Sequence, residues 1–313
     1  MQALLVDHFG GPEVITVGEL PLPEPAQGEV LVRVVAAGIG PWDVEQRRGG
    51  WKGSLPYVPG AQFAGVVVGN TGDDAAFEDG EEVYGWAGPG GCHAEYVTCQ
   101  AERLAPIPDG LRMTDAAAVP VDALTAEQGI TGVLAVGAGD QVLITAAASG
   151  LGQFAVQLAR AAGASVVATA NRRDHEFVHK LGAAVVIDQT SLDWPDQVRE
   201  ATYGGPQRVL ACTASSVPGA ARAARDGATI AAPFRGQFPD AHRVDWRPYE
   251  GQPSGSDLIR MAPQFDDGTL SVQVAGMYYW QEAAKAYRAA EQGDTPGEIV
   301  LIVDVDLAAT LEV

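Results

Sequence analysis

The chain has 313 residues, a length that favours two domains over one. Hydrophobic residues make up 47% of it and charged residues 19%, so a sizeable core can form and global disorder is excluded. The formal net charge of −20 disfavours nucleic acid and anionic membranes as partners, because both repel a chain this acidic.

The three cysteines are too few for a disulfide framework, which favours a reducing compartment. Residues 1–10 contain neither the basic nor the apolar segment of a signal peptide. No apolar run reaches the length of a membrane span. We therefore expect a cytoplasmic protein that makes no membrane contact.

The first third of the chain is rich in β-type patterns. Strands are predicted over residues 29–35, 63–68 and 81–84, where apolar and β-branched residues alternate or cluster. Glycines between these runs and prolines before them supply the turns. Short strands separated in this way are typical of a small barrel or a rolled sheet.

From residue 120 onward, strands and helices alternate. Serial strand–helix order indicates a parallel sheet covered on both faces, which is the doubly wound Rossmann architecture. The predicted strands are 141–145, 165–169, 184–187, 208–212 and 228–232, and the predicted helices are 151–162, 173–181 and one within 194–202.

The last part of the chain is less regular. Residues 238–255 hold three prolines and little periodicity, so a loop is predicted there. A helix near 257–265, a strand near 271–275 and a helix over 281–291 follow. The final strand, 298–303, is expected to return to the N-terminal domain.

Residues 145–152 read Thr-Ala-Ala-Ala-Ser-Gly-Leu-Gly and join the first strand of the alternating segment to its helix. Small residues in such a turn let backbone N–H groups reach a pyrophosphate, and the helix N-terminus adds its positive dipole end. Ser149 stands where the glycine fingerprint has a glycine, so a plain tight turn is the alternative. The strand–helix–strand context favours a dinucleotide. The expected contacts are Ala148, Ser149, Gly150, Leu151 and Gly152.

The end of the second strand of this unit indicates which dinucleotide binds. An NAD site has an acid about 20 residues further on, which binds the ribose hydroxyls. Here that position is Asn171, and Arg172 and Arg173 follow it. We expect no carboxylate to repel a 2′-phosphate there, and two guanidiniums to pair with it. The pattern therefore predicts NADPH, although arginines at a helix start are often only solvated.

Other chemistries find little support. Cys92 and His93 are adjacent and Cys99 follows, but no Cys-x-x-Cys occurs, so structural cysteines are expected and no metal site. The turn at 147–151 lacks the flanking glycines of a serine-hydrolase elbow.

A set of motifs occurs in the order of one known family. They are Phe9-Gly-Gly-Pro-Glu-Val14, Gly28-Glu-Val-Leu-Val32, Val58-Pro-Gly60, Ala94-Glu-Tyr-Val97, Pro106-Ile-Pro-Asp-Gly110, Leu124-Thr-Ala126, Val156-Gln-Leu-Ala159 and Gly297-Glu-Ile-Val-Leu301. Each is weak alone, but the ordered set resembles the quinone oxidoreductase branch of the medium-chain dehydrogenase/reductase superfamily over nearly the whole chain.

The resemblance implies an α/β fold in which a Rossmann doubly wound parallel sheet is inserted in a GroES-like, β-rich catalytic domain. The catalytic domain would comprise residues 1–119 and 251–313, and the NADPH-binding domain residues 120–250. It also implies a homodimer, cofactor contacts from Asp43 and Thr125, and hydride transfer from NADPH to a quinone or an α,β-unsaturated carbonyl.

The resemblance implies a zinc-free enzyme with an altered pocket. Zinc enzymes of the superfamily carry a Cys where this chain has Gly40, and His-Glu where it has Ala61-Gln62. The chain also departs from the quinone reductases themselves, which makes a more specialised enone or enoyl substrate plausible. These departures are Gly40 for Asn, Gln62 for an acid, Glu45 and Trp51 for two tyrosines, Asp174 for a phosphate-pairing Lys and Gln189 for a Tyr.

Three residues are candidates for catalysis by their position: Tyr57, His93 and Trp51. His93 titrates near neutrality when unperturbed, but a loop histidine is more often a surface residue. Tyr57 either acts in the pocket or simply packs before Pro59-Gly60, and Trp51 is expected to shape the pocket. Asp43 is as well placed to cap a helix that begins near Val44. The alternative function is a non-catalytic NADPH-binding protein, a redox sensor or a structural recruit.

Overall fold

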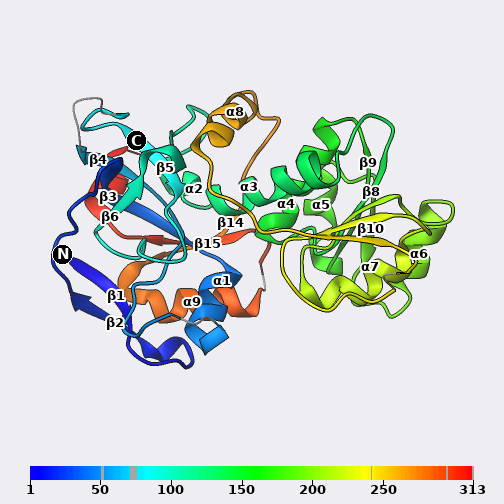
Figure 1. Ribbon diagram of the computed structural model, residues 1–313, viewed down its shortest axis with the longest axis horizontal. Coiled ribbons are helices and arrows are strands. Elements are labelled where there is room, and N and C mark those ends of the chain that lie inside the picture. The colour runs from blue at the N-terminus through cyan, green and yellow to red at the C-terminus, as the bar shows by residue number, and fades with distance from the viewer. Residues whose placement is uncertain (51–52, 71–75, 241, 294, 312–313) are drawn as a thin grey trace. The chain divides into compact units, whose positions relative to one another are not determined.

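The computed structural model describes residues 1–50, 53–70, 76–240, 242–293 and 295–311. The chain folds as two compact units (Figure 1). Unit 1 comprises Met1–Val121, Pro253–Gly268 and Val272–Val313, and unit 2 comprises Asp122–Gln252 and Thr269–Ser271. In chain order, unit 2 is thus inserted in unit 1.

Unit 1 is built on a seven-stranded sheet of order β14-β15-β3-β4-β5-β7, with β6 also paired to β3, and on the hairpin of β1 and β2. Its strands are β1 (Gln2–Val6), β2 (Ile15–Glu19), β3 (Glu29–Ile39), β4 (Gln62–Asn70), β5 (Glu82–Trp86), β6 (Tyr96–Gln100), β7 (Leu104–Pro106), β14 (Val274–Tyr279) and β15 (Glu298–Ile302). Its helices are α1 (Pro41–Glu45), α2 (Met113–Ala116), α8 (Gly255–Asp266), α9 (Ala283–Gln292) and α10 (Val305–Leu311).

Strand β3 organises unit 1. Its 11 residues pair with β4 on one side, while on the other side the first half pairs with β6 and the second half with β15. All five residues of β15 are buried, which explains why this apolar strand returns to the N-terminal part of the chain, as predicted. Figure 1 shows β15, in red, beside the blue strands.

Unit 2 is a six-stranded parallel sheet of order β10-β9-β8-β11-β12-β13. The strands are β8 (Gln141–Ile144), β9 (Ser165–Ala170), β10 (Val185–Asp188), β11 (Arg208–Leu210), β12 (Thr229–Ala232) and β13 (Asp245–Pro248). The helices are α3 (Pro120–Glu127), which begins at the border of the units, α4 (Gly150–Ala161), α5 (His175–Leu181), α6 (Trp194–Ala201) and α7 (Val217–Ala223).

The predicted doubly wound architecture is confirmed. The strand order reverses at β8, and α4 and α5 lie on one face of the sheet with α6 and α7 on the other. Valines, alanines and other apolar residues of the central strands fill both interfaces, as strands covered on two faces require. Ligands of such sheets bind outside the carboxyl ends of the strands where the order reverses, which here are β8 and β11.

The predicted loop at 238–255 is wrong in part, because it contains strand β13, the sixth strand of the parallel sheet. Only Trp246 of this short edge strand turns its side chain inward, where it stacks on Phe238 at 4.7 Å between ring centroids. In the sequence, the exposed Asp245 and Arg247 obscure the alternation of apolar and polar residues by which a strand is predicted. Pro248 is tolerated because an edge strand pairs with only one neighbouring strand.

Three smaller boundaries also differ. β14 begins at Val274, three residues later than the predicted strand near 271–275. Thr269–Ser271, just before it, belong to unit 2. The helix predicted from residue 173 begins as a 3-10 turn, and α5 starts at His175. The helix predicted near Val44 begins at Pro41, a residue suited to a first helical turn.

Replacing Phe63 tests the packing of unit 1. Phe63 is fully buried on β4 between β3 and β5, so Phe63→Ala should lower the free energy of unfolding by about 3–5 kcal/mol. Calorimetry would measure the shift. Leu22→Ala, at a half-exposed loop position, is the control and should change it by no more than about 0.5 kcal/mol. Equal effects would contradict the assigned core.

Candidate functional site

The turn between β8 and α4 is tightly constructed. A Cβ on Gly152 would lie 2.4 Å from the carbonyl oxygen of Ala146 and 2.6 Å from the Cα of Ala147, so only glycine fits there. Ala146 has a φ of +49°, which non-glycine residues rarely adopt. Thr169 of β9 holds the turn with two hydrogen bonds. Its hydroxyl oxygen accepts from the Ala146 N–H at 3.2 Å, and its carbonyl oxygen accepts from the Ala147 N–H at 2.8 Å.

This turn presents backbone donors at the start of a 12-residue helix. Ser149 is the N-cap of α4, and its hydroxyl accepts from the Gly152 N–H at 3.1 Å. Among the described residues, the N–H groups of Gly150 and Leu151 have no hydrogen-bond partner. Free N–H groups and the positive end of the helix dipole together suit a phosphate. The half-buried Ala148 completes the turn with a side chain too small to obstruct it.

Asn171, Arg172 and Arg173 leave the carboxyl end of β9, next to the end of β10. The Asn171 side-chain oxygen accepts from the Gln189 amide at 3.0 Å. The expectation of no carboxylate here is wrong, because Arg172 Nε lies 3.5 Å from the Asp188 carboxylate. Arg173 Nε lies 3.7 Å from the carboxylate of its neighbour Asp174. Each guanidinium therefore already faces an acid.

Thr125 lies on α3 and is nearly buried. Its carbonyl oxygen accepts from the hydroxyl of Tyr249 at 2.9 Å. The Tyr249 hydroxyl also approaches Gly129, where a Cβ would meet it at 2.3 Å. The residue that follows β13 is thus tied to α3, a link that sequence reasoning missed because it treated residues 238–255 as a loop.

In unit 1, Asp43 is fully buried on α1. One carboxylate oxygen accepts from the Gly40 N–H at 2.9 Å and the other from the Gly60 N–H at 3.0 Å. Burial raises the pKa of Asp43 to about 7, against the effect of these two donors. The carboxylate thus joins the segment after β3 to the segment before β4. A cofactor contact stays a prediction, and the burial speaks against it.

His93 is fully buried and not the surface residue that its loop position suggests. Its Nε2 lies 3.1 Å from the carbonyl oxygen of Gly38, so this nitrogen carries the proton. Nδ1 then accepts from the Tyr287 hydroxyl at 3.1 Å. Burial lowers the pKa of His93 to about 4, so the ring is neutral at physiological pH. His93 therefore links β3 to α9 and holds no proton that it readily gives up.

Tyr57 is half-buried, and its backbone pairs with Val6 at the end of β1. Burial and the charge of Asp43 raise the pKa of Tyr57 to about 12, while Arg47 acts in the opposite direction. The phenol therefore keeps its proton at neutral pH and can donate it in a hydrogen bond. Trp51, the third catalytic candidate, lies outside the described residues.

Arg47 is a buried arginine that lies near Tyr287. Arg47 pairs with Glu291 of α9, donates to the carbonyl oxygen of Gly10 and lies 5.7 Å from the ring centroid of Tyr287. It ties the segment after α1 to α9. The hydrogen bond between His93 and Tyr287 ties the loop before β6 to the same helix. No local pattern reveals these partners, because they lie far away in the sequence.

The structure thus brings the predicted residues together in two groups. In unit 2, Ala148, Ser149, Gly150, Leu151 and Gly152 form the phosphate-type turn, with Asn171, Arg172 and Arg173 at the end of the neighbouring strand. In unit 1, Asp43 and Tyr57 interact electrostatically, and His93 is linked to the same surroundings through Tyr287.

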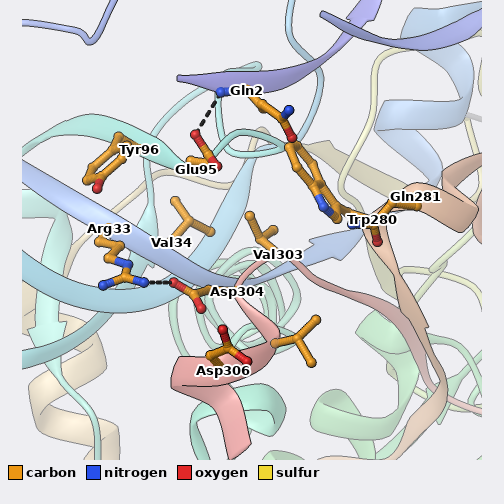
Figure 2. A pocket seen from close by; sticks show the side chains of 11 residues that line it. Gln2, Arg33, Val34, Glu95, Tyr96, Trp280, Gln281, Val303, Asp304 and Asp306 are labelled. Carbon is orange, nitrogen blue, oxygen red and sulfur yellow. Dashed lines mark hydrogen bonds and ion pairs between the residues drawn. The ribbon is translucent and has the colours of Figure 1, made fainter. Parts of the chain in front are cut away.

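A hollow of about 330 Å³ lies elsewhere on unit 1 (Figure 2). Val34, Val303 and Trp280 contribute apolar walls, and acids stand on its rim. Two of these acids are already engaged: Asp304 pairs with Arg33, and the Glu95 carboxylate accepts from the Gln2 N–H at 2.7 Å. None of the predicted site residues lines the hollow, so we do not assign it to the candidate site.

Metal ligands do not gather in the described part of the chain. No three His, Cys, Asp or Glu side chains come together there in a way that could hold a metal ion. Gln62, at the position of an acid in the zinc enzymes, uses both ends of its amide. Its nitrogen donates to Glu298 at 2.6 Å, and its oxygen accepts from the Val121 N–H at 2.8 Å. In the same described residues, no helix is long and apolar enough to cross a membrane.

Two family models match the chain, one in each unit. The model described as "Alcohol dehydrogenase GroES-like domain" matches residues 26–109. The model described as "Zinc-binding dehydrogenase" matches residues 150–232. They correspond to the β-rich part and to the parallel sheet, respectively.

Curated relatives include two kinds of protein. Quinone oxidoreductase of Homo sapiens is 31% identical over 204 residues, which are 64% of this chain and 62% of that protein. A mycocerosic acid synthase-like polyketide synthase of Mycobacterium tuberculosis is 38% identical over 205 residues, which are 64% of this chain and 9% of the synthase. The matched region thus spans less than two thirds of either relative.

Solved structures match over almost the full chain. The crystal structure of an NAD-dependent alcohol dehydrogenase has 32% sequence identity and a TM-score of 0.89, covering 97% of this chain and 100% of that chain. A mycobacterial protein in complex with NADPH has 28% identity and a TM-score of 0.86, with the same coverage. This chain belongs to the quinone oxidoreductase-like branch of the medium-chain dehydrogenase/reductase superfamily. The predicted family and the GroES-like character of unit 1 are confirmed.

Gly152→Ala tests whether the turn of this oxidoreductase is a nucleotide site. The added methyl must displace the Ala146 carbonyl and with it the free N–H groups, so affinity for NADPH and NADH should fall at least about tenfold. Nicotinamide fluorescence would measure both dissociation constants. Gly132→Ala is the matched control, since nothing lies within 4 Å of its added Cβ. Unchanged binding in Gly152→Ala would contradict the assignment.

Asp43→Asn tests the buried carboxylate through pH. The folded-state pKa of about 7 lies above the unfolded value, so the folded chain holds a proton that the unfolded chain releases between about pH 4 and about pH 7. The contribution of Asp43 to the free energy of unfolding of the wild type therefore falls as the pH rises through this range. Asparagine does not titrate, so the variant's deficit should shrink by about 2 kcal/mol between about pH 5 and about pH 8. Urea unfolding at both pH values checks this, and a constant deficit would be the contrary result.

Proposed function

We propose that the protein is an NADPH-dependent oxidoreductase that transfers hydride to a quinone or another α,β-unsaturated carbonyl without zinc. The observation that carries the proposal is the β8–α4 turn, where Gly152 permits close approach and the N–H groups of Gly150 and Leu151 have no partner within the described part of the chain. Membership of the quinone oxidoreductase-like branch supports the reaction type.

The residues at this turn fit a pyrophosphate. Gly150 and Leu151 would donate backbone N–H groups to it, and the N-terminus of α4 would supply a favourable field. Arg172 and Arg173 would pair with the 2′-phosphate of NADPH. NADPH supplies the hydride when bound. The mycobacterial structure in complex with NADPH supports this choice of nucleotide.

Among the described candidates, Tyr57 is the best placed to act on the substrate. Its side chain is half-buried, with the hydroxyl oxygen itself buried, and its pKa of about 12 keeps the phenol protonated at neutral pH. Hydride addition to a conjugated carbonyl leaves negative charge on the carbonyl oxygen, which a phenolic O–H stabilises by donating a hydrogen bond. Asp43 and Arg47 would tune this donor, since both alter the pKa of Tyr57.

His93 would be a positioning residue and not a catalytic one. Its neutral ring bonds Gly38 and Tyr287, so it would fix the end of β3 against α9 without passing on a proton. This proposal replaces the catalytic acid role first considered for His93, which its burial and its pKa of about 4 disfavour.

Zinc independence is part of the proposal. It is supported by the residues at the ligand positions of the zinc enzymes, Gly40, Ala61 and Gln62, which offer no thiolate, imidazole or carboxylate. The homodimer and the cytoplasmic location stay predictions.

The names of the relatives point to two substrate classes. One relative is a quinone oxidoreductase, and another is a polyketide synthase, so we consider a quinone and an enoyl acyl chain as acceptors. Both substrates contain a carbonyl conjugated to a carbon–carbon double bond, so the same hydride chemistry serves both.

Turnover experiments test the proposal directly. Titration with NADPH and NADH, followed by a panel of quinones, enones and enoyl thioesters, should show NADPH binding and NADPH oxidation with at least one acceptor. Binding without turnover across the panel would favour the non-catalytic alternative. Failure to bind either nucleotide would refute the proposal.

Tyr57→Phe tests the assigned hydrogen-bond donor. Loss of the phenolic O–H should lower kcat at least about tenfold, as removing one donor to a developing oxyanion does, and leave the NADPH dissociation constant within about twofold. Stopped-flow absorbance of NADPH would separate the two quantities. Tyr203→Phe, at a side chain that is almost fully exposed, is the matched control and should retain full kcat. An unimpaired kcat in Tyr57→Phe would remove Tyr57 from the mechanism.

A further inference from the structure

The carboxyl ends of β9 and β10 form one corner of the sheet in unit 2. The two strands are parallel, and Ala170 is paired with Asp188 in register. The residues that follow them therefore leave the sheet side by side. Gln189 bonds the Asn171 side chain, and its N–H donates to the Ala170 carbonyl at 2.9 Å. This is the corner where a dinucleotide of this fold places its adenosine ribose.

Asp188 is the fixed member of its ion pair with Arg172. One carboxylate oxygen accepts from both the hydroxyl and the N–H of Thr190, at 2.7 Å and 3.0 Å. These bonds, with a smaller contribution from Arg172, lower the pKa of Asp188, so the group is ionised at neutral pH. Its side chain is only 18% exposed. The negative charge therefore stays in place whether or not a nucleotide is bound.

Arg172 is the movable member of the pair. Its side chain is 85% exposed, and a single contact of 3.5 Å joins it to Asp188. A guanidinium held so loosely can turn toward a phosphate, but it must leave its carboxylate to do so. Arg173 Nε lies 3.7 Å from the carboxylate of Asp174, so each of the two guanidiniums faces an aspartate.

We propose that Asp188 is a specificity-determining residue of the nucleotide site, because it competes with the 2′-phosphate of NADPH for the guanidinium of Arg172. A 2′-hydroxyl brings no charge and leaves the ion pair undisturbed. The selectivity of the protein for NADPH over NADH is therefore modest, and one negative charge sets it. The inference rests on the proposed function, which supplies the nucleotide.

Asp188→Asn removes the charge and keeps an oxygen that can accept from Thr190. The exchange should tighten NADPH binding about fivefold and leave NADH binding within about twofold, because only the phosphate gains from the released arginine. The readout is the ratio of the two dissociation constants from nicotinamide fluorescence at fixed low salt. In an Arg172→Ala background, the same exchange should change this ratio less than about twofold, since no competition is left.

Asp226→Asn is the matched control. Asp226 pairs with Arg243 at 3.0 Å and precedes β12, the neighbour of edge strand β13, so the exchange removes the same charge far from β9 and β10 in the same sheet. It should leave the ratio unchanged. An unchanged ratio in Asp188→Asn, an equal shift in Asp226→Asn, or a full shift without Arg172 would overturn the inference and leave the proposed function standing. A wild-type protein that binds neither nucleotide would overturn both.

Discussion

The candidate site of unit 2 depends on how closely helix α4 approaches the end of strand β8. Gly152 is pressed against the Ala146 carbonyl, and any side chain there would push the helix away from the sheet. Thr169 fixes the turn from the next strand, and Ser149 caps the helix through Gly152. The N–H groups of Gly150 and Leu151 are thus held at the positive end of a 12-residue helix, with no partner in the residues that the structure describes. In a mobile turn, ordering these N–H groups would cost conformational entropy when a ligand binds. A turn that is already fixed avoids this cost.

Charge at the site follows local rules, not the −20 of the whole chain. At the end of β9, Arg172 faces Asp188 and Arg173 faces Asp174, so these four charges balance within an acidic protein. In unit 1, the buried Asp43 and Arg47 do not pair with each other: two backbone N–H groups hold Asp43, and Glu291 holds Arg47. Buried charges satisfied separately can both act on Tyr57, one raising and one lowering its pKa. Because the pKa of Asp43 is about 7, the charge that it places near Tyr57 changes with pH around neutrality.

Sequence reasoning recovered what local patterns encode. The apolar runs of the parallel sheet, the small residues of the β8–α4 turn and the return of β15 are all contained in short segments. It failed where distant residues meet. Tyr287 is 194 residues from His93, and nothing near either position signals the bond that makes His93 a buried, neutral linker. Asp188 was overlooked because the pairing of β9 with β10, not sequence distance, brings it to Arg172, and β13 was overlooked because an edge strand needs only one inward side chain.

The central claim is that a nicotinamide dinucleotide lies with its diphosphate on the β8–α4 turn. Hydrogen–deuterium exchange of the intact protein with and without saturating NADPH, followed by mass spectrometry, tests it most directly. The account predicts slower exchange in peptides that contain Gly150 and Leu151, whose N–H groups have no partner among the described residues, and in peptides that contain Asn171 to Arg173. NADPH that binds without slowing exchange at Gly150 and Leu151 would contradict the account.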